Sequence, residues 1–203
     1  MTDDATRHNQ AVYDKIAAVY ARRQAGREPA FADLRSALTA RLPPGAGLAD
    51  LGCGPAGDGG LFAAAGYRVA GADRSAGMLA VAARSLPGRV VQADLRCLPF
   101  GDASLDGIWC CAALLHVPHH DTAAALGEMR RVLRRPGYLA LITAMGEGTR
   151  LEPVPYAPGE QRWFCYRQAA ELHGQLLAAG LRVLSMTEES ANRHWLKVLA
   201  SAA

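Results

Sequence analysis

Hydrophobic residues in this chain form short continuous runs, most of them separated by longer segments of helical spacing. The short runs predict buried strands, and the longer segments predict helices that cover them. We expect strands at 48–51, 67–72, 89–93, 107–112, 138–144, 181–187 and 193–200. We expect the intervening helices at 59–66, 75–86, 121–133 and 166–180. This alternation indicates an α/β fold with a doubly wound, mostly parallel sheet.

The two ends of the chain depart from this alternation. Only a short link separates the last two strands, so we expect them to pair as an antiparallel hairpin. Two helical segments, 9–23 and 30–42, precede the first strand, and "PPG" stops the second of them. Capping residues mark other helix ends: Ser75 and Asp121 as N-caps, and Gly180 after the last helix.

A glycine-rich turn follows the first predicted strand, in "LADLGCGPAGDG". Gly52, Gly54 and Gly57 have the G-x-G-x-x-G spacing that is typical of dinucleotide sites. Asp50 and Asp58 flank these glycines, and their charge would oppose a pyrophosphate at a helix N-terminus. The same charge favours a ligand with an ammonium and a sulfonium, such as S-adenosylmethionine. The alternative is a tight turn with two solvated acids.

Acidic residues also end the next two predicted strands. Asp73 closes the second strand, where a carboxylate can accept hydrogen bonds from both ribose hydroxyls. Asp94 closes the third strand, where it can accept from an adenine amine while Leu95 packs beside the ring. Ligands of open α/β sheets bind at the carboxyl ends of the strands. The glycine turn and these acids therefore predict one nucleoside site.

Together these segments resemble class I S-adenosylmethionine-dependent methyltransferases. The similarity is to the small-molecule type that includes the ubiquinone and menaquinone biosynthesis enzymes, and it covers nearly the whole chain. The segments that carry it are "VYDKIAAVYARR", "ADLGCGPAGD", "GADRSAGML", "QADLRCLPF", "SLDGIWCCAALLHVP" and "EMRRVLRRPGYLALI". Tyr138 departs from the pattern because a second glycine is usual there. Gly59 and Gly60 weaken the start of a core helix.

The resemblance implies a seven-stranded sheet of order 3-2-1-4-5-7-6 with the seventh strand antiparallel. It implies an N-terminal helical lid, residues 1–45, over a cofactor-binding core, residues 46–203. The cofactor would be S-adenosylmethionine and the product S-adenosylhomocysteine. The expected cofactor-binding residues are Tyr13, Tyr20, Asp50, Gly52, Cys53, Gly54, Asp73, Arg74, Met78, Asp94, Leu95 and Cys111.

His116 is the candidate catalytic residue, because the resemblance puts it near the transferred methyl group. An imidazole has a suitable ordinary pKa for a general base. The alternative is that His116 only packs against the cofactor or orients the substrate. His119 and His120 lie close in sequence, but no further ligand is placed beside them, so we expect no metal site.

The segment 146–166 is long and rich in proline and glycine, which is typical of a functional lid or of disorder. Trp163 and Tyr166 lie at its end and are expected to wall an apolar substrate pocket together with Tyr13 and Tyr20. The alternative is that these aromatic side chains anchor the loop to the core.

Composition and charge narrow the classes of function. The net charge of +3 is mild, and half of the residues are hydrophobic. Four arginines between 130 and 135 suit the end of a helix, and they lack the interleaved aromatics of a base-stacking surface. The longest apolar runs fall far short of the ~20 residues of a membrane-spanning helix. Five cysteines without C-x-x-C spacing, and a polar N-terminus, indicate reduced thiols in a cytoplasm.

The sequence therefore predicts methyl transfer to a small-molecule acceptor by direct in-line displacement. The alternatives are a methyltransferase for RNA or protein, a cofactor binder that does not methylate, and a dehydrogenase. We expect a monomer or homodimer without a membrane or nucleic-acid partner. A sulfonium is an activated methyl donor, so positioning and exclusion of water can supply most of the rate.

Overall fold

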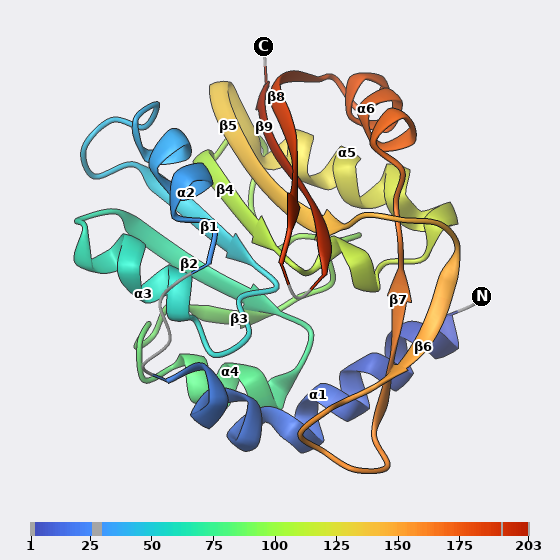
Figure 1. Cartoon of the computed structure of the whole chain (residues 1–203). Coiled ribbons are helices and arrows are strands. Elements are labelled where there is room, and N and C mark those ends of the chain that lie inside the picture. Colours follow the sequence, from blue (N-terminus) through green and yellow to red (C-terminus); the bar gives the residue numbers. More distant parts are fainter. Residues whose placement is uncertain (1–2, 26–29, 192, 203) are drawn as a thin grey trace.

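The fold is that of a computed structural model, which describes residues 3–25, 30–191 and 193–202 (Figure 1). Its main sheet has seven strands in the order β3-β2-β1-β4-β5-β9-β8. They are β1 (Gly47–Leu51), β2 (Arg68–Asp73), β3 (Val90–Gln92), β4 (Leu105–Cys111), β5 (Leu133–Ala144), β8 (Leu181–Ser190) and β9 (His194–Ala202). β9 is antiparallel to both neighbours, whereas the other pairs are parallel. Counted along this sheet alone, the order is the predicted 3-2-1-4-5-7-6.

Helices cover both faces of the sheet, as expected of a doubly wound fold (Figure 1). One face carries α2 (Ala32–Thr39), α3 (Gly57–Ala64) and α4 (Ala76–Ala82), and the other carries α5 (Thr122–Val132) and α6 (Ala169–Ala178). The residues of β4 alternate between these two apolar layers. Trp109 packs with α2 and α3, whereas Ile108 and Cys110 pack with α5 and α6.

The helix ends test the predicted caps. The Ser75 hydroxyl accepts a hydrogen bond from the Met78 amide at 3.0 Å, which confirms the N-cap of α4. Gly180 follows α6 at a φ of +77°, a left-handed conformation that favours glycine. Asp121 is the N-cap residue of α5, as predicted, but its side chain makes no capping hydrogen bond to the helix. Its carboxylate instead accepts from the Arg96 guanidinium at 2.6 Å.

The segment 146–166 forms more regular structure than its proline and glycine content indicates. β6 (Thr149–Pro153) and β7 (Gln161–Cys165) pair as a separate antiparallel hairpin, so the prediction of a loop or of disorder is wrong here. β7 contains Trp163 and Phe164, and aromatic residues favour a half-buried strand. The connection between the two strands contains Pro155, Pro158 and Gly159.

The N-terminal helix α1 (Asp3–Gln24) lies against α4 and beside β7 (Figure 1). Val12 and Ile16 pack with Met78 and Val154 in a small apolar cluster. A Cβ at Gly77 would lie 2.7 Å from a backbone oxygen of α1, so glycine permits this close approach. The division into residues 1–45 and 46–203 stays a prediction, and residues 1–2 and 26–29 lie outside the described part. No helix described here has both the length and the apolar character needed to cross a membrane.

Candidate functional site

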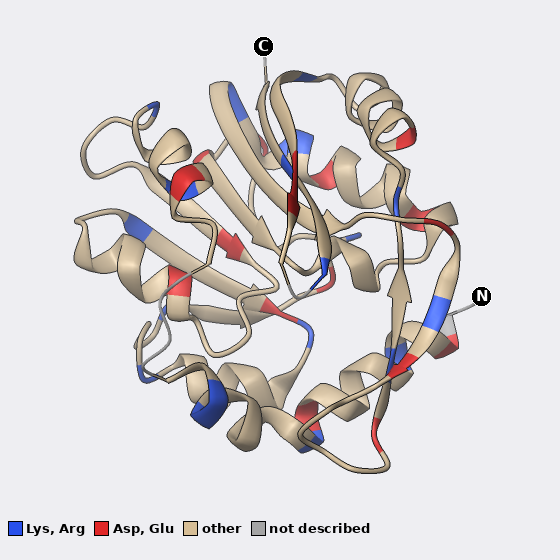
Figure 2. Ribbon diagram, in the orientation of Figure 1, with Lys and Arg blue, Asp and Glu red and all other residues tan. Residues whose placement is uncertain are grey.

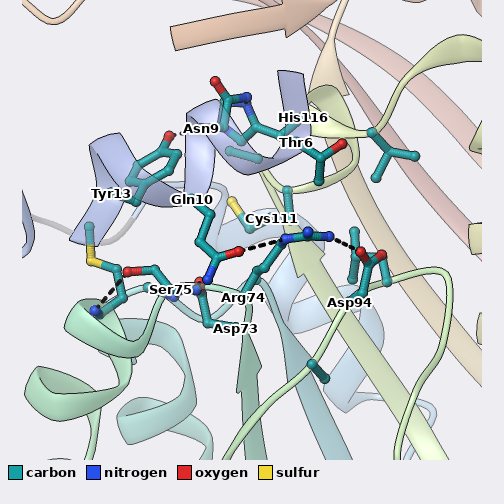
Figure 3. Close-up of a pocket in the computed structure, with 18 of the residues that line it drawn as sticks. Thr6, Asn9, Gln10, Tyr13, Asp73, Arg74, Ser75, Asp94, Cys111 and His116 are labelled. Atoms are coloured by element: carbon teal, nitrogen blue, oxygen red, sulfur yellow. Dashed lines mark hydrogen bonds and ion pairs between the residues drawn. The ribbon is translucent and has the colours of Figure 1, made fainter. Parts of the chain in front are cut away.

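A pocket lies at the carboxyl ends of the parallel strands, with α1 over it (Figure 3). Turns after β1, β2, β3 and β4 form one side, and α1 forms the other. His116 and all the predicted cofactor-binding residues except Asp50 and Cys53 line this pocket. α1 adds Thr6, Asn9 and Gln10, which were not predicted from the sequence. Their helical spacing with Tyr13 is the signal that could have found them.

The glycine turn after β1 depends on two left-handed residues. Gly52 and Gly54 have φ values of +68° and +52°. A Cβ at Gly52 would lie 2.2 Å from the Cβ of Ala113, in the turn after β4. The Ala72 carbonyl accepts from the Gly52 and Cys53 amides at 2.7 and 3.0 Å, which ties the turn to β2. The result is a tight backbone turn with no side chain at Gly54, open to the pocket.

Asp73 lies at the end of β2 with its carboxylate at the pocket wall (Figure 3). One oxygen accepts from the Gly54 amide and the other from the Ser75 amide, both at 2.8 Å. Burial raises the pKa of Asp73, and the amide hydrogen bonds oppose that rise. Each carboxylate oxygen keeps a further lone pair for a ligand. The arrangement therefore suits two neighbouring hydroxyl donors, as the ribose prediction requires.

Asp94 lines the pocket but is held by two arginines. Its carboxylate accepts from Arg96 at 2.7 Å and forms an ion pair with Arg74. Burial raises the pKa of Asp94, but the charge and hydrogen bonds of these arginines hold it below its ordinary value. Arg74 also donates to the Gln10 amide oxygen at 3.0 Å, so its side chain links α1 to the end of β3 (Figure 3). The predicted contact of Asp94 with adenine stays a prediction.

The two acids that flank the glycines lie beneath the turn. Asp50 is buried and accepts from the Gly59 amide at 3.0 Å, and its burial raises its pKa to about 8. A Cβ at Gly59 would lie 2.9 Å from the same carboxylate, which explains a glycine in this helix. Asp58 pairs with Arg35 and accepts from the Trp109 indole. Asp50 is therefore outside the pocket lining, and its predicted contact with the cofactor stays untested.

The cysteines predicted at the cofactor site lie in different places. Cys111 lines the pocket at the end of β4. Cys53 is buried beneath the turn, where its thiol lies 3.6 Å from the Gly54 carbonyl oxygen. Burial raises the pKa of both thiols, so neither is poised as a thiolate.

His116 lies opposite the acidic turns and contacts α1 (Figure 3). Its Nδ1 lies 2.9 Å from the Trp163 carbonyl oxygen, which can only accept, and 3.1 Å from the Asn9 amide nitrogen, which can only donate. We assign the proton to Nδ1 because the contact with the carbonyl oxygen is the shorter of the two. Nε2 is then the acceptor for the Tyr13 hydroxyl at 2.8 Å. Burial lowers the pKa of His116 to about 3, helped by nearby arginines. The imidazole is neutral, and its basic nitrogen is already occupied by a phenol.

The predicted substrate residues Trp163 and Tyr166 do not line this pocket. The Trp163 backbone exchanges two hydrogen bonds with the Asn9 side chain, at 2.8 and 2.9 Å, and so fastens α1 to β7. The Tyr166 hydroxyl is bound to Glu152 and Arg193. These contacts fit the alternative in which the aromatic segment anchors the hairpin, while a role in binding substrate stays a prediction. The described residues place no group of three or more His, Cys, Asp or Glu for a metal ion.

Comparison with known proteins connects this geometry to a family. Residues 49–141 match the family described as "Methyltransferase domain". Malonyl-[acyl-carrier protein] O-methyltransferase of Enterobacter lignolyticus is 39% identical over 111 residues, 53% of this chain and 43% of that protein. Methyltransferase GfsG of Streptomyces halstedii is 36% identical over 170 residues, 75% of this chain. The chain spans 59% of the length of GfsG.

Solved structures share the fold. One is the Burkholderia thailandensis 1,6-didemethyltoxoflavin-N1-methyltransferase, with bound 1,6-didemethyltoxoflavin and S-adenosylhomocysteine. It has a TM-score of 0.71 and 24% identity, with 94% of this chain and 87% of that chain covered. An S-adenosylmethionine-dependent methyltransferase of Methanosarcina mazei has a TM-score of 0.72 and 20% identity, covering 81% and 96%. Residues 49–141 therefore form a methyltransferase domain, and the chain shares the fold of solved S-adenosylmethionine-dependent methyltransferases.

Proposed function

We propose that this protein transfers the methyl group of S-adenosylmethionine to a small-molecule acceptor by direct in-line displacement. The observation that carries the proposal is the pocket itself. Its strand-end side, Gly52, Gly54, Asp73 and Asp94, has the chemistry for an adenosyl group, and α1 covers it. A covered pocket leaves room for a compact acceptor rather than for a polymer.

The residues of the pocket have distinct roles in this proposal. Asp73 holds the ribose hydroxyls, and the glycine turn lets the backbone approach the amino-acid end of the cofactor. S-adenosylmethionine supplies a methyl group on a sulfonium, which an acceptor lone pair can displace without a protein nucleophile. α1 excludes water and carries Tyr13 and Tyr20 to the acceptor. We propose that residues 1–45 form a lid that excludes water from the pocket.

Two relatives make a small acceptor plausible for this chain. The Burkholderia methyltransferase holds 1,6-didemethyltoxoflavin, a small heterocycle, together with S-adenosylhomocysteine. The name of the Enterobacter relative describes methylation of an oxygen on a carrier-bound malonyl group. We further propose a cytoplasmic enzyme, because all five cysteines are free thiols and four of them are covered from solvent at least in part.

Transfer of radiolabel tests this function. The protein is incubated with methyl-tritiated S-adenosylmethionine and a cell extract that is separated into metabolites, RNA and protein. We expect label in the low-mass fraction, and none when α1 is deleted. Label confined to the RNA or protein fraction would establish the alternative acceptors instead. Cofactor binding with no label in any fraction would favour the non-methylating binder.

A further inference from the structure

The two sides of the pocket lie in different electrostatic surroundings. Asp73, Asp94 and Arg74 line the strand-end side, whereas three arginines outside the pocket lining act on His116 and lower its pKa. They are Arg162, Arg193 and Arg167, from β7, the turn before β9 and the segment after β7. Figure 2 shows basic and acidic positions along β6 and β7. The His116 side of the pocket therefore has a positive potential that an acceptor must match.

Little of this positive charge is neutralised. Arg193 forms an ion pair with Glu152 at 2.6 Å. Glu152 stands opposite Arg162 in the hairpin, but its carboxylate is already bound to Arg193 and to the Tyr166 hydroxyl. Among the described residues, neither Arg162 nor Arg167 forms an ion pair with a carboxylate. Arg167 is buried but donates to the Cys165 and Val117 carbonyls and to the Thr122 hydroxyl. Arg162 is half-buried and has no carboxylate partner in the described part of the chain, so a group that completes the site beside it is expected to be an anion.

Arg162 acts on the pocket through Tyr13. Its guanidinium lies over the rings of Tyr13 and Phe164, with centroids 5.4 and 5.3 Å away. It donates to the Tyr13 hydroxyl at 2.9 Å, and its Nε is buried without a partner. A phenol oxygen that accepts from a cation becomes a stronger donor through its own proton. Tyr13 lines the pocket, so this donor is placed where an acceptor would lie.

His116 holds the donor in place without competing for the acceptor's proton. Because Nδ1 donates to the Trp163 carbonyl, Nε2 has only a lone pair, which accepts from Tyr13. A neutral, desolvated imidazole in a positive field is a weak base. His116 is therefore not an efficient base for removing a proton from the acceptor. A site of this kind suits a nucleophile that arrives already ionised.

Resting on the function proposed above, we propose that the methylated atom belongs to an anionic oxygen group, a carboxylate or an ionised hydroxyl, selected by Tyr13 with Arg162 behind it. The Tyr13 proton turns from His116 Nε2 to that group. One oxygen lone pair forms the bond to the methyl carbon while the carbon–sulfur pair leaves with sulfur. The product is a neutral ester or ether, and no proton is transferred.

Matched probes test the selection for charge. The full chain is loaded with S-adenosylhomocysteine and titrated with benzoate against benzamide and with octanoate against octanamide. The pair 4-nitrophenolate and 4-nitroanisole tests the ionised hydroxyl in the same titration. We expect the anion of a pair to bind at least about tenfold more tightly. Arg162→Gln and Tyr13→Phe should abolish the preference, whereas Arg162→Lys keeps part of it because the charge remains.

Arg182→Gln is the matched control, because Arg182 is exposed on β8 and the variant changes only the net charge. It should keep the preference of the unchanged protein. Nitrogen NMR of labelled histidine adds a readout that folding alone does not move: the anion should shift the His116 Nε2 signal, and the amide should not.

The outcomes separate this inference from the proposed function. Failure to bind S-adenosylhomocysteine would remove the function itself. Binding of S-adenosylhomocysteine with no preference for the anion in any pair, including no probe binding, would overturn only the inference. A preference that survives Arg162→Gln in a folded protein would also overturn it.

Discussion

The strand-end side of the pocket and the side formed by α1 and His116 are built in different ways. On the strand-end side, the polar groups are held from the same or the next turn, Asp73 by the Gly54 and Ser75 amides and Asp94 by Arg74 and Arg96. On the other side, side chains from distant segments hold one another, as Tyr13, His116 and Arg162 do. The first side is a fixed receptor for a cofactor, whereas the second depends on the docking of one helix.

Deleting residues 1–28 should have the largest effect, because it removes one side of the pocket and leaves the other. The truncated chain keeps all strands of the main sheet, so we expect a folded core. Turnover should be undetectable and S-adenosylhomocysteine should bind weakly, since Asn9 and Tyr13 are lost. Circular dichroism, calorimetry and radiolabel transfer measure the three properties. Normal turnover would show that α1 has no part in the site.

Asp73→Ala changes the strand-end side of the pocket alone. Cofactor binding should weaken by roughly 2–4 kcal/mol, because two hydroxyl donors lose a charged acceptor. The side chain is largely covered and supports two amides, so we also expect a loss of unfolding free energy of about 1–2 kcal/mol. Asp73→Asn is the matched control, since it keeps the shape and one acceptor oxygen. Unchanged affinity for S-adenosylhomocysteine in Asp73→Ala would contradict the ribose assignment.

His116 should make the stability of the protein depend on pH. The pKa of His116 is lowered from 6.5 to about 3, so between these values the unfolded chain binds the proton more tightly. The contribution of the neutral His116 to the free energy of unfolding is therefore complete above pH 6.5 and is lost as the pH falls toward 3. From pH 7 to pH 5 the loss should be about 2 kcal/mol.

Urea unfolding of the unchanged protein and of His116→Gln at both pH values isolates this contribution. Subtraction is necessary because the raised pKa of Asp50 acts in the opposite direction. Equal pH dependence of the two proteins would show that His116 is not buried in the neutral form.

His116→Ala should have the smallest effect on chemistry. If the acceptor is already an anion, the imidazole only holds the Tyr13 hydroxyl, and we expect turnover to fall about tenfold with cofactor affinity unchanged. A general base would be worth ~10²–10⁴-fold. Turnover reduced by more than about a thousandfold, with cofactor binding intact, would identify His116 as the base and weaken the case for an anionic acceptor.

The two sides also differ in what could be predicted from the sequence. Asp73, Gly52 and Gly54 were predictable because a strand end and its turn are contiguous in the chain. The bond between Tyr13 and His116 joins residues 103 positions apart, and that between Asn9 and Trp163 joins residues 154 apart. Neither pairing leaves a local pattern. The position of Asp50 beneath the turn was not predictable either, because burial of a strand-end side chain depends on the helix packed over it.

The hairpin β6–β7 shows a second limit. Its prolines and glycines predicted a loop, but the antiparallel pairing of β6 with β7 supplies backbone hydrogen bonds that composition does not reveal. Arg162 was missed for the same reason, since its role depends on α1 docking against this hairpin.

Calorimetry of the full chain with S-adenosylhomocysteine, NAD and NADP tests the central claim most directly. The strand-end side should bind S-adenosylhomocysteine tightly and give no heat with either nicotinamide cofactor, because a pyrophosphate would approach a turn flanked by Asp73 and underlain by Asp50. Tight binding of NAD without binding of S-adenosylhomocysteine would contradict the account.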